Sequence, residues 1–383
     1  MKIRYLLLHA YGLGGTIRTV TNQANAMAAR GHEVEVVSVV RRRDEARFKL
    51  DPRVRRSALV DQRGGVEPDS LSRRAWRKLR GRVVPRGEFA ADWFTERVER
   101  AVIDYVSGLR DGILVTTRPA LNLISARRGS ARVVRVAQEH MSLTAYREPV
   151  RQEIAKYYGR LDAVQVLTKA NQEEYHGLLP GIRVVRIPNA VHSVDNKHSA
   201  QEHRTVVAVG RLVTQKGFDL LIPAFTQAAE RHPGWQLRIY GSGARRDQLQ
   251  ALISDPERIR LMGSTGRLDE HLAKSAIYVL SSRFEGLPMA MIEAMTHALP
   301  VVSFDCPTGP RDVLTHGVDG LLVPPEDVAG LTAALDLLMG DRELRLRMGA
   351  AAAATARAYS TEQVTPLWEE LFTELSSRRS GSA

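Results

Sequence analysis

The sequence has few features that would cross-link the chain or anchor it in a bilayer. Cys306 is the single cysteine among 383 residues, so no disulfide can form within the chain, which suits a reducing compartment. No apolar run reaches the about 18 residues that a transmembrane helix needs. The N-terminal apolar stretch is short and leads into a glycine-rich turn, so it is a poor signal peptide. We expect a cytoplasmic protein, with peripheral attachment to the inner face of the membrane left open.

Positive charge is concentrated in one segment. The formal net charge is +12, and residues 41–86 contain 16 Lys and Arg against 6 Asp and Glu. Such a segment attracts phosphates on a polyanion or an anionic lipid surface, although a solvated basic loop has the same composition. No nucleic-acid module motif accompanies the charge, so we expect no nucleic-acid partner.

Strands and helices alternate along the chain, and the pattern starts twice. Strands are predicted at residues 2–9, 33–40, 113–117, 132–137, 163–168 and 184–188, and again at 205–210, 236–241, 277–282, 300–304 and 320–324. The first helix is expected over residues 16–30, and closing helices near 326–339, 341–358 and 361–377. The polar residues 192–204 read as an interdomain linker. We predict an α/β fold with two doubly wound parallel sheets and a cleft between them.

Several candidate ligand-binding groups follow the predicted strands, where such sheets bind ligands. Gly14 and Gly15 could admit a ligand to the backbone, but their spacing is not the dinucleotide fingerprint, and a tight turn alone needs the same residues. Arg211 and Lys216 share one short loop and could hold a diphosphate, or could be ordinary surface cations.

Two further strand ends have similar features. His140 follows a first-half strand and could be either a catalytic group or a packing residue. Gly241 opens a Gly-Ser-Gly turn before a helix, which could supply donors to phosphates.

Two carboxylates lie in the stretch RFEGLPMAMIEAM, residues 283–295. Glu285 sits among turn formers, and Pro288 suits the start of a helix that would place Glu293 in its second turn. A carboxylate is a good acceptor for sugar hydroxyls. By periodicity alone, Glu293 shares a face with Thr296 and His297, which could simply be the solvated side of the helix.

In combination these motifs resemble glycosyltransferase family 4, whose members are retaining, nucleotide-sugar-dependent enzymes of the GT-B fold. The resemblance is strong over residues 205–355, through GRLVTQKG, SSRFEGLPMAMIEAM, PVVSFDCPTGPRDVL and DGLLV. In the first half only GLGGT, the following helix and QEH match. The resemblance implies an acceptor-binding domain over residues 1–192 and a nucleotide-sugar-binding domain over 203–358. A C-terminal helix within 359–383 is expected to pack back on the first domain.

The resemblance also implies roles for individual residues. Glu293 would bind the ribose, Glu285 the donor sugar, and Arg211 and Lys216 the diphosphate. His140 would sit beside the anomeric centre, and the backbone at Gly14, Gly15, Gly210, Gly241, Gly286 and Leu287 would approach the donor. No metal or other cofactor is expected. Relatives often have an acid directly after CPTGP, where this chain has Arg311 and then Asp312, so Asp312 is given no donor role.

The implied reaction moves a hexose or N-acetylhexosamine from a nucleoside diphosphate sugar, favoured as a UDP-sugar, to a hydroxyl of an acceptor. The favoured acceptor is a cell-wall or teichoic-type polymer, or a lipid-linked or other glycan, contacted by Arg73, Arg74, Trp76, Arg77 and Lys78. A small-metabolite acceptor, a UDP-sugar 2-epimerase of the same fold and a non-catalytic polyanion-binding protein remain as alternatives.

Overall fold

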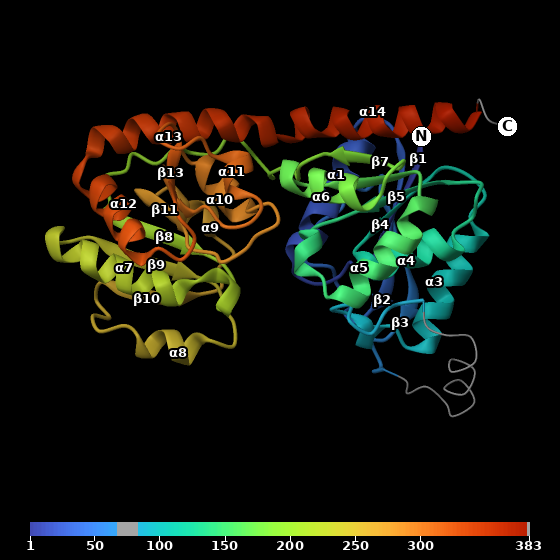
Figure 1. The fold of residues 1–383 in the computed structure, drawn as a ribbon, viewed down its shortest axis with the longest axis horizontal. Helices are drawn as coiled ribbons and strands as arrows, with labels where there is room; N and C mark the ends of the chain where they lie inside the picture. Colours follow the sequence, from blue (N-terminus) through green and yellow to red (C-terminus); the bar gives the residue numbers. More distant parts are fainter. Residues whose placement is uncertain (67–82, 381–383) are drawn as a thin grey trace. The chain divides into compact units, whose positions relative to one another are not determined.

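The computed structural model describes residues 1–66 and 83–380 and divides the chain into two compact units. Unit 1 comprises Met1–Ala190 and Val364–Ala383, and unit 2 comprises Val191–Gln363 (Figure 1). Each unit has its own parallel sheet and its own helices, so the predicted fold class is confirmed. None of the described helices combines the length and apolarity needed to span a bilayer.

Unit 1 is built on a seven-stranded sheet of order β3-β2-β1-β4-β5-β6-β7, and every pairing in it is parallel. Its strands are β1 (Lys2–Leu7), β2 (Glu33–Arg41), β3 (Arg55–Asp61), β4 (Ile113–Thr117), β5 (Val134–Gln138), β6 (Ala163–Val166) and β7 (Arg183–Arg186). Its α-helices are α1 (Gly15–Ala29), α3 (Glu96–Gly108), α4 (Pro119–Arg128), α5 (Glu148–Tyr157) and α6 (Lys169–Leu178), joined by α14 (Thr361–Ser380). The 3-10 turns in its described residues are η1 (Ala91–Trp93), η2 (Leu143–Ala145) and η3 (Tyr158–Arg160).

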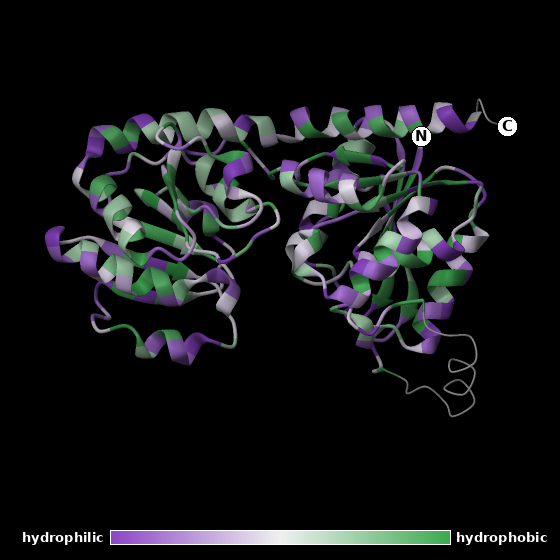
Figure 2. Ribbon diagram, in the orientation of Figure 1, coloured by the Kyte–Doolittle hydropathy of each residue, from purple (hydrophilic) through white to green (hydrophobic). Residues whose placement is uncertain are grey.

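Both faces of this sheet are covered by helices. Successive residues of a strand point to opposite faces, so Tyr5 and Leu7 of β1 share a core with α1 and α14, whereas Leu6 shares one with α3 and α4. Figure 2 shows the hydrophobic colouring along these strands. Burial on both faces explains why the strands read as nearly continuous apolar runs in the sequence.

Helix α14 belongs to the core of unit 1, although unit 2 precedes it in the sequence. Its inward face packs on the same core as α1, through Val364, Trp368, Leu371, Phe372 and Leu375. Ion pairs hold the helix along its length: Arg30 to Glu369 at 2.6 Å, Arg183 to Glu374 at 3.3 Å and Arg379 to Asp162 at 3.0 Å. The first unit is therefore assembled from two separate stretches of chain.

Unit 2 is built on a six-stranded parallel sheet of order β10-β9-β8-β11-β12-β13. Its strands are β8 (Thr205–Val209), β9 (Gln236–Tyr240), β10 (Ile259–Gly263), β11 (Ile277–Leu280), β12 (Val301–Phe304) and β13 (Gly320–Val323). Its α-helices are α7 (Phe218–Arg231), α8 (Arg246–Ala251), α9 (Leu268–Leu272), α10 (Met289–Met295), α11 (Pro310–Val313), α12 (Val328–Gly340) and α13 (Arg342–Ala356), with the 3-10 turns η4 (Thr214–Lys216) and η5 (Arg357–Tyr359).

Helices α7 and α12 cover one face of the second sheet, and α10 packs on β11 and against α13. The segment 191–204, which precedes β8, has neither helix nor strand, yet it is packed onto unit 2. Ser199 Oγ donates to the Ser275 carbonyl at 2.5 Å, and Gln201 Nε2 donates to the Ala298 carbonyl at 2.9 Å. These bonds hold on unit 2 the segment that the sequence analysis interprets as an interdomain linker.

Two strands are absent from the sequence-based prediction. Strand β3 lies inside the basic segment, where only Val60 of its seven residues is buried, because it is the edge strand of its sheet. Strand β10 is the corresponding edge strand of unit 2, and it buries Ile259 and Leu261 in alternation. Edge strands bury little surface, so their apolar signal is weak.

Candidate functional site

In unit 2 the strand order reverses between β8 and β11, which are neighbours in the sheet. Ligands of doubly wound sheets bind beyond the carboxyl ends of the strands at such a switch point. The loops that follow four strands meet here. Leu212 N–H donates to the Ser242 carbonyl at 2.9 Å, Arg283 N–H to the Gln215 carbonyl at 2.8 Å, and Glu285 N–H to the Pro307 carbonyl at 3.4 Å.

Lys216 and Glu285 form a largely buried ion pair at this point. Lys216 Nζ lies 2.6 Å from Glu285 Oε1, and the two side chains are 17% and 8% exposed. Ser282 Oγ donates to the same carboxylate oxygen at 2.5 Å, and the Thr308 hydroxyl donates to the Glu285 carbonyl. Glu285 is thus fixed by groups from the β8, β11 and β12 loops, and the hydrogen bonds among described residues leave its Oε2 unused.

Arg211 lies on the same loop as Lys216 but is exposed. Its Nη2 donates to Gln215 Oε1 at 3.4 Å, and Gln215 in turn donates to the Phe284 carbonyl at 3.0 Å. Arg211 forms no ion pair with any other described residue. One cation of this loop is therefore bound to a carboxylate, and the other is free to meet an anion.

The loops that carry Gly210 and Gly241 approach closely, and this approach requires Gly241 to be glycine. A Cβ on Gly241, whose φ is +146°, would lie 1.8 Å from the Gly210 carbonyl oxygen. The N–H of Gly210 donates to the Tyr240 carbonyl and that of Gly241 to the Gly263 carbonyl, both at 2.9 Å. These two N–H groups are engaged within the fold, so any ligand contact of these residues relies on the missing side chain.

Glu293 is partly exposed on α10, while Thr296 and His297 are 1% and 2% exposed. The helix face that carries these residues is therefore not solvated, and the interpretation of that face as the solvated side of the helix is wrong. Tyr278 of β11 lies near both carboxylates without a hydrogen bond to either. Burial raises the pKa of its hydroxyl well above the usual value, and Glu285 and Glu293 raise that pKa further, so both acids lie near Tyr278. That hydroxyl has no partner among the described residues.

The backbone between the two acids approaches the same place. Leu287 is buried, and within the described part of the chain no hydrogen bond uses the N–H of Gly286 or Leu287. In the following loop, Arg311 forms an ion pair with Asp305. The Asp312 carbonyl accepts a hydrogen bond from the Tyr359 hydroxyl at 3.3 Å.

Unit 1 has a pocket of about 390 Å³ at the carboxyl ends of β1, β4 and β5. Its lining includes His9, Trp93, Arg118, His140 and Tyr146. His140 Nε2 is buried and has no hydrogen-bond partner among the described residues. Burial lowers the pKa of the imidazole to about 4, with a contribution from the Arg118 charge, so His140 is neutral near pH 7.

Glu139 anchors the strand end that presents His140, a role that the sequence analysis did not assign. Its carboxylate accepts hydrogen bonds from Tyr158 at 2.6 Å, Tyr146 at 2.7 Å and Asn122 Nδ2 at 2.8 Å. Burial raises the pKa of Glu139. The only available signal was an acid at the end of an apolar strand, since its partners are distant in sequence.

Gly14 and Gly15 are exposed at the start of α1, and the packing does not require them to be glycine. A Cβ on Gly15 would meet no atom within 4 Å, and one on Gly14 would only touch Ile17 at 3.8 Å. This contrasts with Gly241. The two glycines leave the first turn of α1 open to an approaching group.

Five predicted contacts, Arg73, Arg74, Trp76, Arg77 and Lys78, lie outside the described residues. In the described part of the basic segment, some charge is paired or stacked. Arg53 pairs with Asp51 at 2.7 Å, Arg63 pairs with Asp61 at 2.6 Å, and the Arg42 guanidinium lies 3.5 Å from the centre of the Trp93 ring. Among residues 1–66 and 83–380, no three His, Cys, Asp or Glu are grouped so that they could hold a metal ion; metal independence stays a prediction.

Comparisons with known proteins give the class of the domain and of the fold. Residues 203–341 match the family model described as "Glycosyl transferases group 1". An exopolysaccharide phosphotransferase of Streptomyces coelicolor is 33% identical over 392 residues, which span 99% of this chain but only 41% of that protein. A poly(ribitol-phosphate) alpha-N-acetylglucosaminyltransferase of Staphylococcus aureus is 27% identical over 217 residues, covering 56% of this chain and 44% of that protein.

Among solved structures, a mutant of S. aureus TarM in complex with fondaparinux, alpha-GlcNAc-glycerol and UDP is similar to this chain with a TM-score of 0.78. The identity is 16%, and the similarity covers 97% of this chain and 100% of that one. The chain therefore has the GT-B fold, and its residues 203–341 match the glycosyltransferase group 1 family model.

Proposed function

We propose that this chain is a retaining glycosyltransferase of the family 4 type. It transfers a hexose or N-acetylhexosamine from a UDP-sugar to a hydroxyl of an anionic cell-wall or exopolysaccharide-type glycan. The observation that carries the proposal is the Lys216–Glu285 pair at the β8/β11 switch point. A cation and a carboxylate fixed side by side suit a ligand that presents phosphates next to sugar hydroxyls.

Each group has a defined task in the proposed reaction. Lys216 and Arg211 bind the diphosphate and stabilise the charge that develops as it leaves. Glu285 Oε2 accepts from hydroxyls of the donor sugar, and Glu293 accepts from the ribose. The N–H groups of Gly286 and Leu287 are available to the same ligand. The departing phosphate oxygen takes the proton of the acceptor hydroxyl, which attacks from the same face and so retains the anomeric configuration.

For unit 1 we propose that the pocket around His140 receives the acceptor. A neutral imidazole can accept or donate a hydrogen bond to a sugar hydroxyl without adding charge. The open first turn of α1 at Gly14 and Gly15 suits an anionic group. No metal or other cofactor is proposed. The relatives named for poly(ribitol-phosphate) and exopolysaccharide chemistry support an anionic glycan as the acceptor class.

The test offers the protein a panel of UDP- and GDP-sugars, with and without poly(ribitol-phosphate), poly(glycerol-phosphate) and neutral glycans, and follows nucleoside diphosphate release. Release that depends on a polymer, with an α-linked product from an α-linked donor by NMR, supports the proposal. Interconversion of the donor sugar without an acceptor would instead indicate an epimerase. Binding of no nucleotide sugar would overturn the enzymatic assignment.

A further inference from the structure

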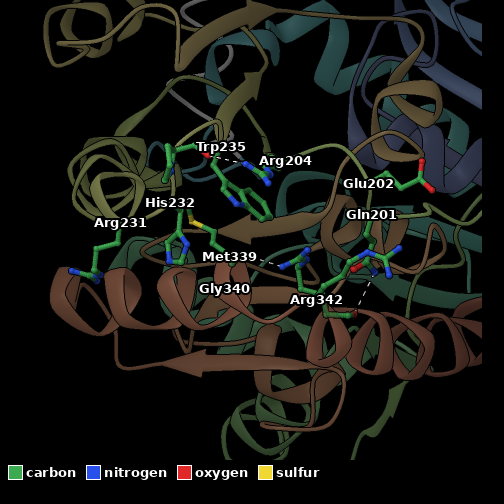
Figure 3. A pocket seen from close by; sticks show the side chains of 11 residues that line it. Gln201, Glu202, Arg204, Arg231, His232, Trp235, Met339, Gly340 and Arg342 are labelled. Carbon is green, nitrogen blue, oxygen red and sulfur yellow. Dashed lines mark hydrogen bonds between the residues drawn. The ribbon is translucent and has the colours of Figure 1, made fainter.

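A second pocket lies at the opposite edge of the unit 2 sheet from the Lys216–Glu285 pair. It has a volume of about 540 Å³ and is lined by residues from three segments (Figure 3). These segments are residues 201–204 before β8, residues 231–235 before β9, and residues 339–345 at the junction of α12 and α13. The strands β8 and β9 begin here, so this arginine pocket is at the amino-terminal edge of the sheet and is separate from the proposed donor site.

Three arginines of the pocket have no carboxylate partner. Arg204, Arg342 and Arg345 take part in no ion pair with another described residue, whereas Arg231, also in the lining, pairs with Asp336 at 2.9 Å. Other arginines of this unit pair with neighbouring acids, for example Arg258, Arg260 and Arg283. Arg204 and Arg342 each donate to one backbone carbonyl, at 3.1 and 3.3 Å, and their other donors form no hydrogen bond with the described residues.

Arg345 is unusual because it is a cation that is only 6% exposed. Its Nη1 donates to the carbonyls of Leu338 and Met339 at 2.6 and 3.2 Å, while its buried Nε has no partner among the described residues. Burial lowers its pKa, and the nearby charges of Arg342 and Arg204 lower it further. Asp341 offsets this in part, but its carboxylate caps α13 by accepting from the Leu344 N–H at 2.8 Å.

Buried charge without a counter-ion is unfavourable, and an anion placed among these guanidinium groups would relieve it. A second polar group also lacks a partner here, because Gln201 is 3% exposed and its Oε1 is bonded to no described residue. Glu202 is the one acidic residue in the lining and is exposed. The pocket therefore carries a net positive charge that the fold itself does not neutralise.

Part of the remaining lining is apolar, and the pocket has more volume than a phosphate alone would fill. Trp235, Pro233 and Met339 contribute to this apolar part, and the Arg345 guanidinium lies 5.1 Å from the centre of the Trp235 ring. Trp235 is 3% exposed, so its ring supports the Arg345 guanidinium and leaves little surface for a ligand. We propose that this arginine pocket binds a phosphate ester, with the phosphate between Arg204, Arg342 and Arg345 and its sugar or polyol in the remaining volume of the pocket.

The phosphate can come from two sources, a free sugar phosphate or a phosphodiester unit of an anionic polymer. Binding is measured by isothermal titration calorimetry on the full chain at fixed ionic strength. The probes are N-acetylglucosamine 1-phosphate, a poly(glycerol-phosphate) oligomer and, as a neutral control, N-acetylglucosamine. The variants are the double substitution Arg204→Gln with Arg342→Gln, both at exposed residues, and the matched control Arg347→Gln, also exposed and on α13 but outside the lining.

The double variant should weaken binding of a phosphate probe at least about tenfold, since a charge-assisted hydrogen bond is worth about that factor or more. Arg347→Gln should leave that binding unchanged. If the double variant weakens only the oligomer, the ligand is a polymer; if it weakens only the monoester, the ligand is a free sugar phosphate. Unchanged affinity in the double variant, or an equal loss in Arg347→Gln, would overturn the proposal.

Phosphates can also bind at the proposed donor site, and the Lys216→Ala variant separates the two. Binding that survives Lys216→Ala and is lost in the double arginine variant belongs to the arginine pocket. The opposite pattern would assign the phosphate to the donor site and reject the arginine pocket. Because the readout is binding and not turnover, this proposal can fail while the proposed glycosyl transfer stands, and the reverse also holds.

Discussion

At the scale of the residue, the proposed site combines one cation that is fixed in an ion pair with another that forms no ion pair with a described residue. Lys216 is bound to Glu285 at 2.6 Å and is largely buried, whereas Arg211 is exposed on the same loop. A preorganised cation costs little reorganisation when a leaving group develops charge, which is why such groups contribute strongly to rate. Removing one partner would leave the other charge largely buried and uncompensated, so a single mutation there changes two properties at once.

Lys216→Ala should reduce turnover by about 100-fold or more, because the proposed function assigns this cation to the leaving diphosphate. It should also destabilise the protein, because Glu285 is left buried without its counter-ion. The double variant Lys216→Met with Glu285→Gln should recover stability in urea denaturation without recovering turnover. Arg211→Ala should lower turnover with no change in stability. Normal turnover in both single variants would refute the diphosphate assignment.

His140 makes stability depend on pH through its burial. Its native pKa of about 4 lies below the ordinary value of 6.5, so between these pH values the unfolded chain binds a proton that the native chain does not. Stability is therefore lost as pH falls through that window. Between pH 7 and pH 5 the wild type should lose about 2 kcal/mol more than His140→Asn, measured by urea denaturation. An equal loss in both proteins would contradict this.

At the scale of the element, α14 covers the sheet of unit 1 with an apolar face. Trp368 on this helix is 2% exposed, whereas the adjacent Leu367 is 41% exposed. Trp368→Ala should reduce the free energy of unfolding by about 3–5 kcal/mol, since it opens a large cavity in the core. Leu367→Ala is the matched control on the same helix and should have little effect. Similar losses in the two variants would mean that the helix is not docked as described.

Sequence patterns predict most readily the strands that are buried on both faces. Strands β1, β4 and β8 are such strands, and their apolar runs identified both sheets. Strand β3 was missed because it is an edge strand with arginines and an aspartate, and these match the composition of a loop. Periodicity also suggested that Glu293, Thr296 and His297 lie on the solvated face of their helix. That interpretation is wrong because Asn196 Nδ2 donates to Thr296 Oγ1 at 2.7 Å, a contact between segments 100 residues apart.

Sequence patterns single out the individual residues of the candidate site, but not the interactions among them. Arg211, Lys216, Glu285 and Glu293 follow strands and match a family motif. The pairing of Lys216 with Glu285 joins residues 69 positions apart, and nothing local encodes it. Glu139 was missed for the same reason, because its tyrosine and asparagine partners come from α4, η2 and η3 or their flanks.

At the scale of the whole molecule, the chain has separate hydrophobic cores in its two units. Calorimetry should therefore resolve two unfolding transitions, and Trp368→Ala should lower the transition of unit 1. UDP at 100 times its dissociation constant should add roughly 2.7 kcal/mol to the stability of unit 2. UDP should thus raise the transition that Trp368→Ala leaves unchanged. A shift of only the other transition would place the nucleotide in unit 1.

The division of unit 1 between two stretches of chain also determines the order in which the protein folds during synthesis. Residues 1–190 emerge from the ribosome first, but their sheet lacks the cover that Val364 to Leu375 provide. Unit 2 is contiguous and can complete its core while the earlier residues still expose an apolar face. The unit that is synthesised first therefore finishes folding last, and its uncovered surface is the one that a chaperone on the nascent chain would bind.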